Sequence, residues 1–224
     1  MGEKMKTFNE LRNLSWTDLK KELGNNLNFK KLINQSRNFL LYSFESLKGN
    51  RKEVSKNTNQ TERLLEQRLC KEQKMFLNKN EPILICQYPT QRGGRSNIDL
   101  LGYNKEKKNL VIGELKLKKN TDPLPKVIMQ CMDYWCFVKE RIKDFKKLLN
   151  DELDLELNEE KNPEIYIIAP KGYFQTRRKK NGEFQIAKNT VIGLEQEGIK
   201  IKIVYLNEKC LEMEEDSSYF NENE

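Results

Sequence analysis

Three charged residues inside two short apolar segments constrain the fold of this chain more than any other feature. Residues 97–103 read NIDLLGY and residues 111–117 read VIGELKL, and both runs are typical of strands in a buried sheet. A buried charge is costly unless it is paired or binds a metal ion. Because alternate strand residues share a face, Glu114 and Lys116 project to one side, and Asp99 lies one hairpin away. The two segments therefore predict a sheet in which two carboxylates and a lysine can hold a divalent cation and activate a water.

The spacing of Glu114 and Lys116 carries little information by itself, because the chain is 33% charged. The same acid–any residue–lysine pattern recurs in predicted helices or polar turns, where solvated charge needs no explanation: DLK at 18–20, EQK at 72–74, EKK at 106–108, DFK at 144–146 and EEK at 159–161. What distinguishes the pair at 114–116 is its apolar strand. The structural alternatives are a turn capped by Asp99 and an internal ion pair between Glu114 and Lys116.

The order of the predicted elements indicates an α/β fold. Apolar patterning predicts, in chain order, a helix, three strands, a helix, a strand, a helix and a strand: 61–78, 83–88, 98–103, 110–117, 126–150, 164–169, 187–197 and 199–206. Residues 164–169 are continuously apolar, which favours burial on both faces of the sheet. Residues 171–182 have the composition of a basic loop. A central mixed β-sheet flanked by helices is the natural packing for this order.

The length of 224 residues fits one domain with a small appendage. Residues 1–60 combine short apolar periodicity with a polar stretch, so we expect an N-terminal helical extension and linker. Residues 61–208 form the predicted domain. Residues 209–224 are expected to be a disordered acidic tail, because residues 212–224 hold six acidic residues and no lysine or arginine.

The net charge of +7 indicates a polyanionic partner, with nucleic acid the first candidate and an anionic membrane the second. Without the acidic tail, the rest of the chain is more basic still. We expect DNA as the partner, keep RNA as an alternative and expect no membrane association. A homodimer is compatible with the sequence. A membrane-surface or protein-interaction domain is a further hypothesis that the basic charge leaves open.

The chain contains no histidine, which excludes Ser–His–Asp triads, Cys–His nucleophiles and His-ligated zinc sites. Catalysis must therefore use carboxylates, lysine, tyrosine, cysteine or a metal ion. The five cysteines form no C-x-x-C pair and are expected to be buried thiols in a reducing compartment. No signal peptide or apolar run of membrane length is visible, so the expected location is cytoplasmic.

The order of the candidate residues resembles that of a known superfamily. Asp99, then Glu114-x-Lys116, then a helix resembles the PD-(D/E)xK nucleases, whose core is called restriction-endonuclease-like. In that helix Gln130 and Tyr134 form a Q-x-x-x-Y sequence, with both side chains on one face. This sequence is similar to that of the RecB-type and λ-exonuclease-type branch. The resemblance implies a restriction-endonuclease-like α/β core behind the N-terminal helical extension.

A second similarity lies just before the first acid. Residues 93–102, GGRSNIDLLG, are similar to the GRIDLLG pattern of Mrr-like and archaeal NucS-like nuclease domains. The motifs cover about residues 61–140, and the later strands match by order only. Asn97-Ile98 stand where a proline often precedes the acid, and Arg95 is two residues further from the strand than in the tighter pattern. The three-cysteine cluster of the iron–sulfur branch is absent, so no iron–sulfur cluster is expected.

The resemblance and the chemistry of the residues imply the same central roles. Asp99 and Glu114 would bind Mg²⁺ or Mn²⁺ through hard oxygen ligands, helped by the backbone carbonyl of Leu115. The metal would polarise the scissile phosphate and lower the pKa of a bound water. Lys116 would orient or activate that water and stabilise charge on the phosphate.

Two helices are expected to complete the site. An acid from the first helix would hold a second metal or its water. Glu66 is preferred because it follows two leucines and should lie near the sheet, and Glu62 is the alternate. Gln130 and Tyr134 would hydrogen-bond the lysine, a water or the phosphate. For both helices the plain alternative is an ordinary amphipathic surface.

Basic residues around these elements are candidates for phosphate contacts. For any single one of them a solvated surface position is an equally good interpretation. Tyr173 and Phe174 could stack on a base or pack in the core, and we favour the core. The candidate nucleic-acid-binding residues are Arg92, Arg95, Lys118, Lys119, Arg177, Arg178 and Lys179.

The sequence therefore predicts a divalent-metal-dependent nuclease that hydrolyses phosphodiester bonds of DNA. The alternative is a catalytically inactive nucleic-acid-binding module of the same fold. The sequence leaves open whether an active enzyme is an endonuclease or an exonuclease, which sequence it recognises and which pathway it serves.

Overall fold

The computed structural model describes residues 62–72, 74–90 and 97–220, together with Thr17, Asp18, Lys21 and Phe44. The predicted N-terminal extension therefore lies almost wholly outside the described residues, and so do Arg92 and Arg95. None of the helices in the described part combines the length and apolar composition needed to cross a membrane.

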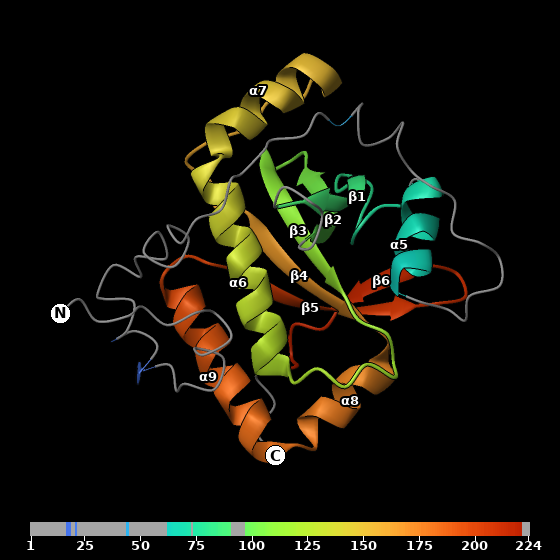
Figure 1. The fold of residues 1–224 in the computed structure, drawn as a ribbon, viewed down its shortest axis with the longest axis vertical. Coiled ribbons are helices and arrows are strands. Elements are labelled where there is room, and N and C mark those ends of the chain that lie inside the picture. The colour runs from blue at the N-terminus through green and yellow to red at the C-terminus, as the bar shows by residue number, and fades with distance from the viewer. Residues whose placement is uncertain are drawn as a thin grey trace.

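The centre of the molecule is a six-stranded mixed sheet whose spatial order follows the chain order (Figure 1). The first three strands pair antiparallel, the third to fifth strands pair parallel, and the last pairs antiparallel. The predicted α/β architecture with a central mixed sheet flanked by helices is thus confirmed. The strands are β1 (Ile83–Pro89), β2 (Asn97–Asn104), β3 (Asn109–Leu115), β4 (Glu164–Ala169), β5 (Ile201–Asn207) and β6 (Glu212–Glu215).

Helices cover both faces of this sheet. α6 (Leu124–Glu140) and α9 (Asn181–Gln196) run side by side over one face, and α5 (Glu62–Lys71) packs beside β1 (Figure 1). In β4, Ile165 and Ile167 pack in the core with α6 and α9, whereas Tyr166 and Ile168 pack in the core that includes α5. Apolar side chains on both faces explain why the sequence of β4 is continuously apolar.

The turn between β2 and β3 fixes how these two strands pair. Residues 105–108 form this turn, and the side chain of Asn104 accepts a hydrogen bond from the backbone N–H of Lys107 at 2.9 Å. Lys108 closes the turn in the left-handed region at φ 54°. The resulting register pairs Leu100 with Gly113. It therefore places the next residues along, Asp99 and Glu114, on adjacent strands.

Three predictions about helices need correction. The helix expected at 61–78 is shorter, because α5 ends at Lys71. The single helix expected at 126–150 is two helices, because the backbone of Arg141 departs from helical geometry between α6 and α7 (Ile142–Leu153). This bend lets Phe145 and Leu149 pack with aromatic residues of β1 and β2. The predicted basic loop at 171–182 is wrong, since it holds α8 (Lys171–Arg178) and the start of α9. Tyr173 and Phe174 are fully buried on α8, so their predicted core position is confirmed.

The prediction of a disordered acidic tail is wrong for residues 209–220. Residues 212–215 form β6 and pair with β5, and Tyr219 and Phe220 are buried against Phe174 and Phe184. Acidic composition misled the prediction because the acids lie on an exposed edge strand while two aromatic residues anchor the segment. Residues 221–224 lie outside the described part of the chain.

Candidate active site

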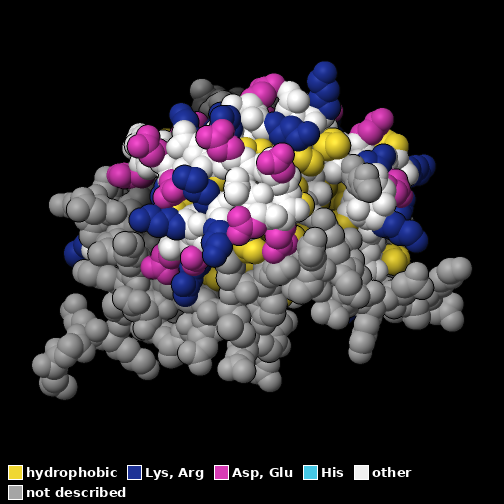
Figure 2. Space-filling model, turned by 90° about the horizontal axis from the view of Figure 1, so that it is seen from above, with side chains coloured by type: hydrophobic (Ala, Val, Ile, Leu, Met, Phe, Trp, Pro, Cys, Tyr) yellow, Lys and Arg dark blue, Asp and Glu magenta, His cyan; other side chains and the backbone are white. Residues whose placement is uncertain are grey.

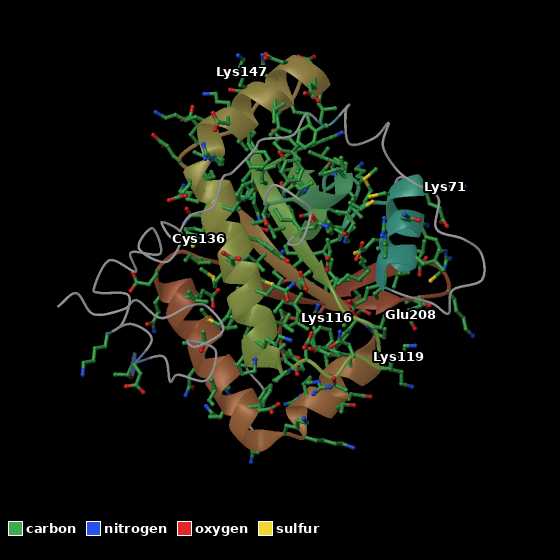
Figure 3. The ribbon with its side chains drawn as sticks, viewed as in Figure 1. Lys71, Lys116, Lys119, Cys136, Lys147 and Glu208 are labelled. Carbon is green, nitrogen blue, oxygen red and sulfur yellow. The ribbon has the colours of Figure 1, made fainter. Side chains whose placement is uncertain are left out.

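Asp99, Glu114 and Lys116 meet at the carboxyl end of β3. The backbone N–H of Lys116 donates to the carbonyl of Ile168 in β4 at 2.8 Å, which fixes the chain where β3 ends. Asp99 reaches across from β2, and its Oδ2 accepts the backbone N–H of Leu115 at 2.9 Å. Figure 3 shows Lys116 at this end of the strand, with Lys119 further along the loop that follows.

Glu114 and Lys116 are buried together. Glu114 is fully buried and Lys116 is 4% exposed, and Lys116 Nζ lies 2.5 Å from Glu114 Oε1. The other oxygen, Glu114 Oε2, is also buried, and when Asp99 and Glu114 are both ionised it has no hydrogen-bond donor in the described part of the chain, whereas a proton on one of them allows a hydrogen bond between the two carboxyls. A buried acceptor without a partner carries the full cost of its lost hydration, so this oxygen is suited to a ligand that brings positive charge.

The neighbour of Glu114 on β2 is another carboxyl group. Burial raises the pKa of Glu114 well above its ordinary value, and the charge of Asp99 raises it further. Burial also raises the pKa of Asp99 to about 6, although Lys116 and the Leu115 N–H act in the opposite direction. Two buried carboxyls in this position favour either a shared proton or a bound cation.

Lys116 is held in its charged form. Burial by itself lowers the pKa of this ammonium group, but the charges of Glu114, Asp99 and Glu62 outweigh burial, so the pKa is raised. A protonated lysine donates hydrogen bonds and does not accept a proton. The structure therefore favours the orienting and charge-stabilising roles predicted for Lys116 over that of a base.

Of the two candidate helix acids, Glu66 is the one that joins the carboxyl pair. It is 2% exposed on the inner face of α5, and its Oε2 accepts the side-chain amide of Gln87 at 2.5 Å. Burial first, and then the charge of Asp99, raise the pKa of Glu66 to about 9. We call Glu66, Asp99, Glu114 and Lys116 the acid cluster.

Gln87 is a residue of this site that the sequence analysis missed. Its Nε2 lies 3.4 Å from Asp99 Oδ1 as well as close to Glu66, and its Oε1 accepts the side-chain amide of Asn97 at 2.9 Å. The signal was present in the sequence, because Gln87 is a polar residue inside the apolar run 83–88, just as Asp99 and Glu114 interrupt theirs.

Glu62 has a different role, because it holds the loop that follows Lys116. Its Oε1 accepts the backbone N–H of Leu117 at 3.3 Å and the side-chain amide of Asn120 at 2.8 Å. From the other side, Arg177 of α8 donates to the carbonyl of Asn120 at 2.8 Å. The Tyr173 hydroxyl donates to the carbonyl of Asp122 at 3.0 Å. The loop that carries the lysine is thus fixed between α5 and α8.

The predicted basic contacts divide into two groups. Arg177 is 5% exposed, with its guanidinium 5.2 Å from the ring centre of Tyr173, so the expectation of a surface contact does not hold for it. Lys118, Lys119 and Lys179 are exposed and Arg178 is half-buried. The stem of Lys118 lies so close to Gly172 that a Cβ there would come within 2.9 Å of it, which brings this lysine against the start of α8.

The Q-x-x-x-Y pair on α6, Gln130 and Tyr134, faces the acid cluster, but the two side chains hydrogen-bond to each other. Gln130 donates to the hydroxyl of Tyr134 at 2.9 Å. Burial, followed by the charges of Glu114 and Asp99, raises the pKa of Tyr134 above its ordinary value. The structure therefore brings α6 to the cluster, while the expected hydrogen bonds from the pair to Lys116 are not among the contacts of the described residues.

The cluster offers a partial ligand set for a hard cation. Asp99 and Glu114 supply two carboxylates, and the unpartnered Oε2 of Glu114 is the oxygen that most lacks a positive neighbour. Within the described residues, no three acidic, cysteine or histidine side chains are grouped closely enough to hold an ion unaided. A carbonyl such as that of Leu115 and waters would have to complete the set, as is common for Mg²⁺.

Comparison with known proteins adds no further constraint. No protein-family model, curated protein or solved structure matches the chain. The interpretation of the site therefore depends on its geometry and on its residue types.

Proposed function

We propose that this protein is a divalent-metal-dependent nuclease that hydrolyses phosphodiester bonds of DNA, built on a restriction-endonuclease-like core. One observation carries the proposal. Glu114 is buried at the carboxyl end of β3, beside the carboxyl of Asp99. One of its oxygens accepts a hydrogen bond from Lys116, and the other has no hydrogen-bond donor among the described residues.

In this proposal Asp99 and Glu114 hold Mg²⁺ or Mn²⁺, with Glu66 next to them. The ion, when bound, supplies polarisation of the scissile phosphate and a lower pKa for a bound water. The fit rests on the donor set, since all three groups are hard oxygen ligands. It also rests on the repulsion between the carboxyls, which a divalent charge relieves.

The protein's own groups then position the phosphate and the attacking water. Lys116 presents a buried ammonium whose charge lies where the phosphate gains negative charge, and such stabilisation is strong in a site that excludes water. Tyr134 accepts the Gln130 amide through its oxygen and makes no other hydrogen bond among those of the described residues, so in this proposal its own proton goes to a phosphate oxygen or an ordered water. The fixed loop after Lys116 keeps the ammonium in place.

Exposed basic residues near the cluster give the DNA a place to lie. Lys118 and Lys119 lie two and three residues after Lys116. The half-buried Arg178 ends α8, which packs against the same loop, and the exposed Lys179 follows it. Figure 2 shows another face of the molecule, on which basic and acidic side chains are intermixed and no large area carries positive charge alone. We therefore place the DNA at the loop and α8.

One observation favours the alternative of an inactive binding module. The 2.5 Å ion pair between Lys116 and Glu114 partly neutralises the acid pair within the protein, as a purely structural pair would. Such a module would bind DNA through its basic residues and leave it uncut in every metal tested.

The test is a cleavage assay on the full chain. Supercoiled plasmid, linear duplex, single-stranded DNA and RNA are incubated with Mg²⁺, with Mn²⁺ and with a chelator. We expect metal-dependent cleavage of DNA that Asp99→Asn abolishes. The matched control is Asp154→Asn, which makes the same change at an exposed position beyond α7. No cleavage under any condition, or full activity in Asp99→Asn, would overturn the proposal.

A further inference from the structure

Gln87 has an unusual backbone for its place in the fold. Four non-glycine residues in the described part of the chain have positive φ: Gln87 at 55°, Lys108 at 54°, Asp154 at 53° and Leu211 at 57°. Lys108 and Leu211 lie in turns between strands, and Asp154 ends α7. Gln87 is the member of this group that lies inside a strand.

The neighbours of the left-handed residue in β1 lie on opposite faces of the sheet. Residues two apart in a strand normally share a face. Here Cys86 packs in the core with α5, whereas Tyr88 packs against Phe137 of α6 and Phe145 of α7. The normal alternation would put Cys86 and Tyr88 on one face. Their partners on β2, Leu100 and Ile98, divide between the same two cores, so the two strands change faces together at Gln87 and Asp99.

The side chain of Gln87 uses this backbone to bridge two acids. Its one amide nitrogen lies 2.5 Å from Glu66 Oε2 on α5 and 3.4 Å from Asp99 Oδ1 on β2. Asn97 donates to the Gln87 oxygen, which directs the amide nitrogen toward the acids. A neutral amide can donate to two carboxyls without adding a charge that would compete with a cation.

Non-glycine residues with left-handed backbone cost free energy, and they cluster at active sites and ligand-binding sites, where the surrounding structure holds them in place. We propose that Gln87 is a positioning residue that keeps Glu66 beside Asp99 so that both carboxyls can serve one divalent cation. This inference rests on the proposed function, since it assumes that the acid cluster binds a metal ion. It adds a residue from β1 to a site otherwise built from α5, β2 and β3.

The test measures Mn²⁺ binding to the full chain by the loss of the free-ion electron paramagnetic resonance signal. Gln87→Gly removes the amide while keeping a residue that adopts positive φ freely. We expect about 10-fold weaker Mn²⁺ binding, the lower end of the range for residues that orient metal ligands. Lys108→Gly is the matched control, because it makes the same backbone change in the β2–β3 turn and should leave Mn²⁺ affinity unchanged.

Two further measurements separate the outcomes. A purely structural Gln87 would lower the midpoint of thermal unfolding and leave the Mn²⁺ affinity of the folded protein at the wild-type value, and that result overturns the inference. If Gln87→Gly does not fold, Gln87→Asn replaces it, since asparagine tolerates this φ and its shorter amide cannot bridge both acids. If wild type and Asp99→Asn bind Mn²⁺ equally, or not at all, the proposed metal site itself fails.

Discussion

Two buried polar groups occupy opposite ends of the same strands, and their difference shows what marks a site. At the carboxyl end of β3 lies the acid cluster. At the other end Glu81 and Glu164 are also buried, but they form what we call the polar network with Asn104, Tyr166 and Lys107. Both contain two or more carboxylates and a lysine, so composition does not separate them.

Hydrogen bonding does separate them. In the polar network Glu81 accepts the amide of Asn104 at 2.8 Å, and the Tyr166 hydroxyl lies within 3.2 Å of carboxylate oxygens of both Glu81 and Glu164. Burial acts to raise the pKa of Glu164, yet Lys107, together with Lys202 and the Tyr166 hydroxyl, outweighs burial and the pKa is lowered. At Glu114 the pKa is raised and one oxygen has no donor in the described residues. The hydrogen-bonded carboxylates of the polar network stabilise the fold, whereas the oxygen of Glu114 without a partner among the described residues is the one that we propose binds a metal ion.

The largest expected effect compares the two lysines. Lys116→Met should lower the rate of DNA cleavage by about 100- to 1000-fold, because it removes a buried positive group from the site of charge development. Lys107→Met removes the equivalent partner from the polar network and should change the rate by about twofold at most. Single-turnover cleavage at saturating Mn²⁺ measures both, with circular dichroism to verify folding. Equal losses of cleavage rate in the two variants would show that the acid cluster and the polar network do not differ in function.

The second comparison concerns stability. Glu81→Ala should lower the free energy of unfolding by about 1–3 kcal/mol, since it leaves the buried Asn104 amide without its acceptor. Glu66→Gln should not lower the free energy of unfolding near neutral pH and should raise it slightly, because the folded carboxyl with its pKa of about 9 must take up a proton that the unfolded chain does not hold, and glutamine needs no proton. Urea unfolding at pH 7 without divalent metal measures the change in the free energy of unfolding for both variants. A greater loss in Glu66→Gln would show that Glu66 is an ordinary structural residue.

The acid cluster and the polar network should make stability depend on pH in opposite directions. The folded pKa of Glu66 is raised from 4.5 to about 9, so its contribution is fully present below pH 4.5 and is lost as the pH rises toward 9. The folded pKa of Glu164 is lowered, so its contribution is present above pH 4.5 and is lost as the pH falls. In metal-free protein we expect Glu66→Gln to flatten the alkaline side by an amount on the order of 1–2 kcal/mol. Glu164→Gln should flatten the acidic side.

Chelator and Mn²⁺ titrations sharpen that comparison. Added Mn²⁺ should raise the midpoint of thermal unfolding most at alkaline pH, where the carboxylates of the acid cluster are ionised and repel one another. It should not alter the acidic limb that Glu164 controls. A shift of equal size at every pH would contradict binding at the acid cluster.

The smallest expected effect concerns the surface. Lys119→Gln should weaken DNA binding by a few fold and reduce the slope of log affinity against log salt by about 1, the signature of one lost phosphate contact. Lys147 is the control, because it is exposed on α7, far from the loop that carries Lys119 (Figure 3). Fluorescence anisotropy across a salt series reads both variants. An equal slope change in Lys147→Gln would indicate that binding is spread over the whole surface.

Much of the fold follows from local rules that the sequence displays. Alternation and a short polar turn place Asp99 and Glu114 side by side, and continuous apolar residues place β4 in the centre. These features depend on neighbours along the chain, which is why they are predictable. The preference for Glu66 over Glu62 followed from the two leucines before it, and the structure places Glu66 beside Asp99.

Other features depend on contacts between distant segments and could not be predicted in this way. The basic run at 171–178 becomes helical because Tyr173 and Phe174 pack into the core, and this outweighs its loop-like composition. Gln87 lacks any sequence mark of positive φ, since glutamine is not a usual residue for that conformation. The sequence predicts Arg177 as a contact on the surface, but in the structure it is buried against Tyr173 and the loop after Lys116.

The acidic strand at the end of the sheet has a practical consequence for handling this protein. β6 lies at the edge of the sheet, and its glutamates are the kind of residue that discourages another chain from adding a further strand. A version shortened to end after β5 would uncover that edge and remove Tyr219 and Phe220 from the interior. Such a version should precipitate during purification at concentrations at which the chain that includes β6 remains in solution.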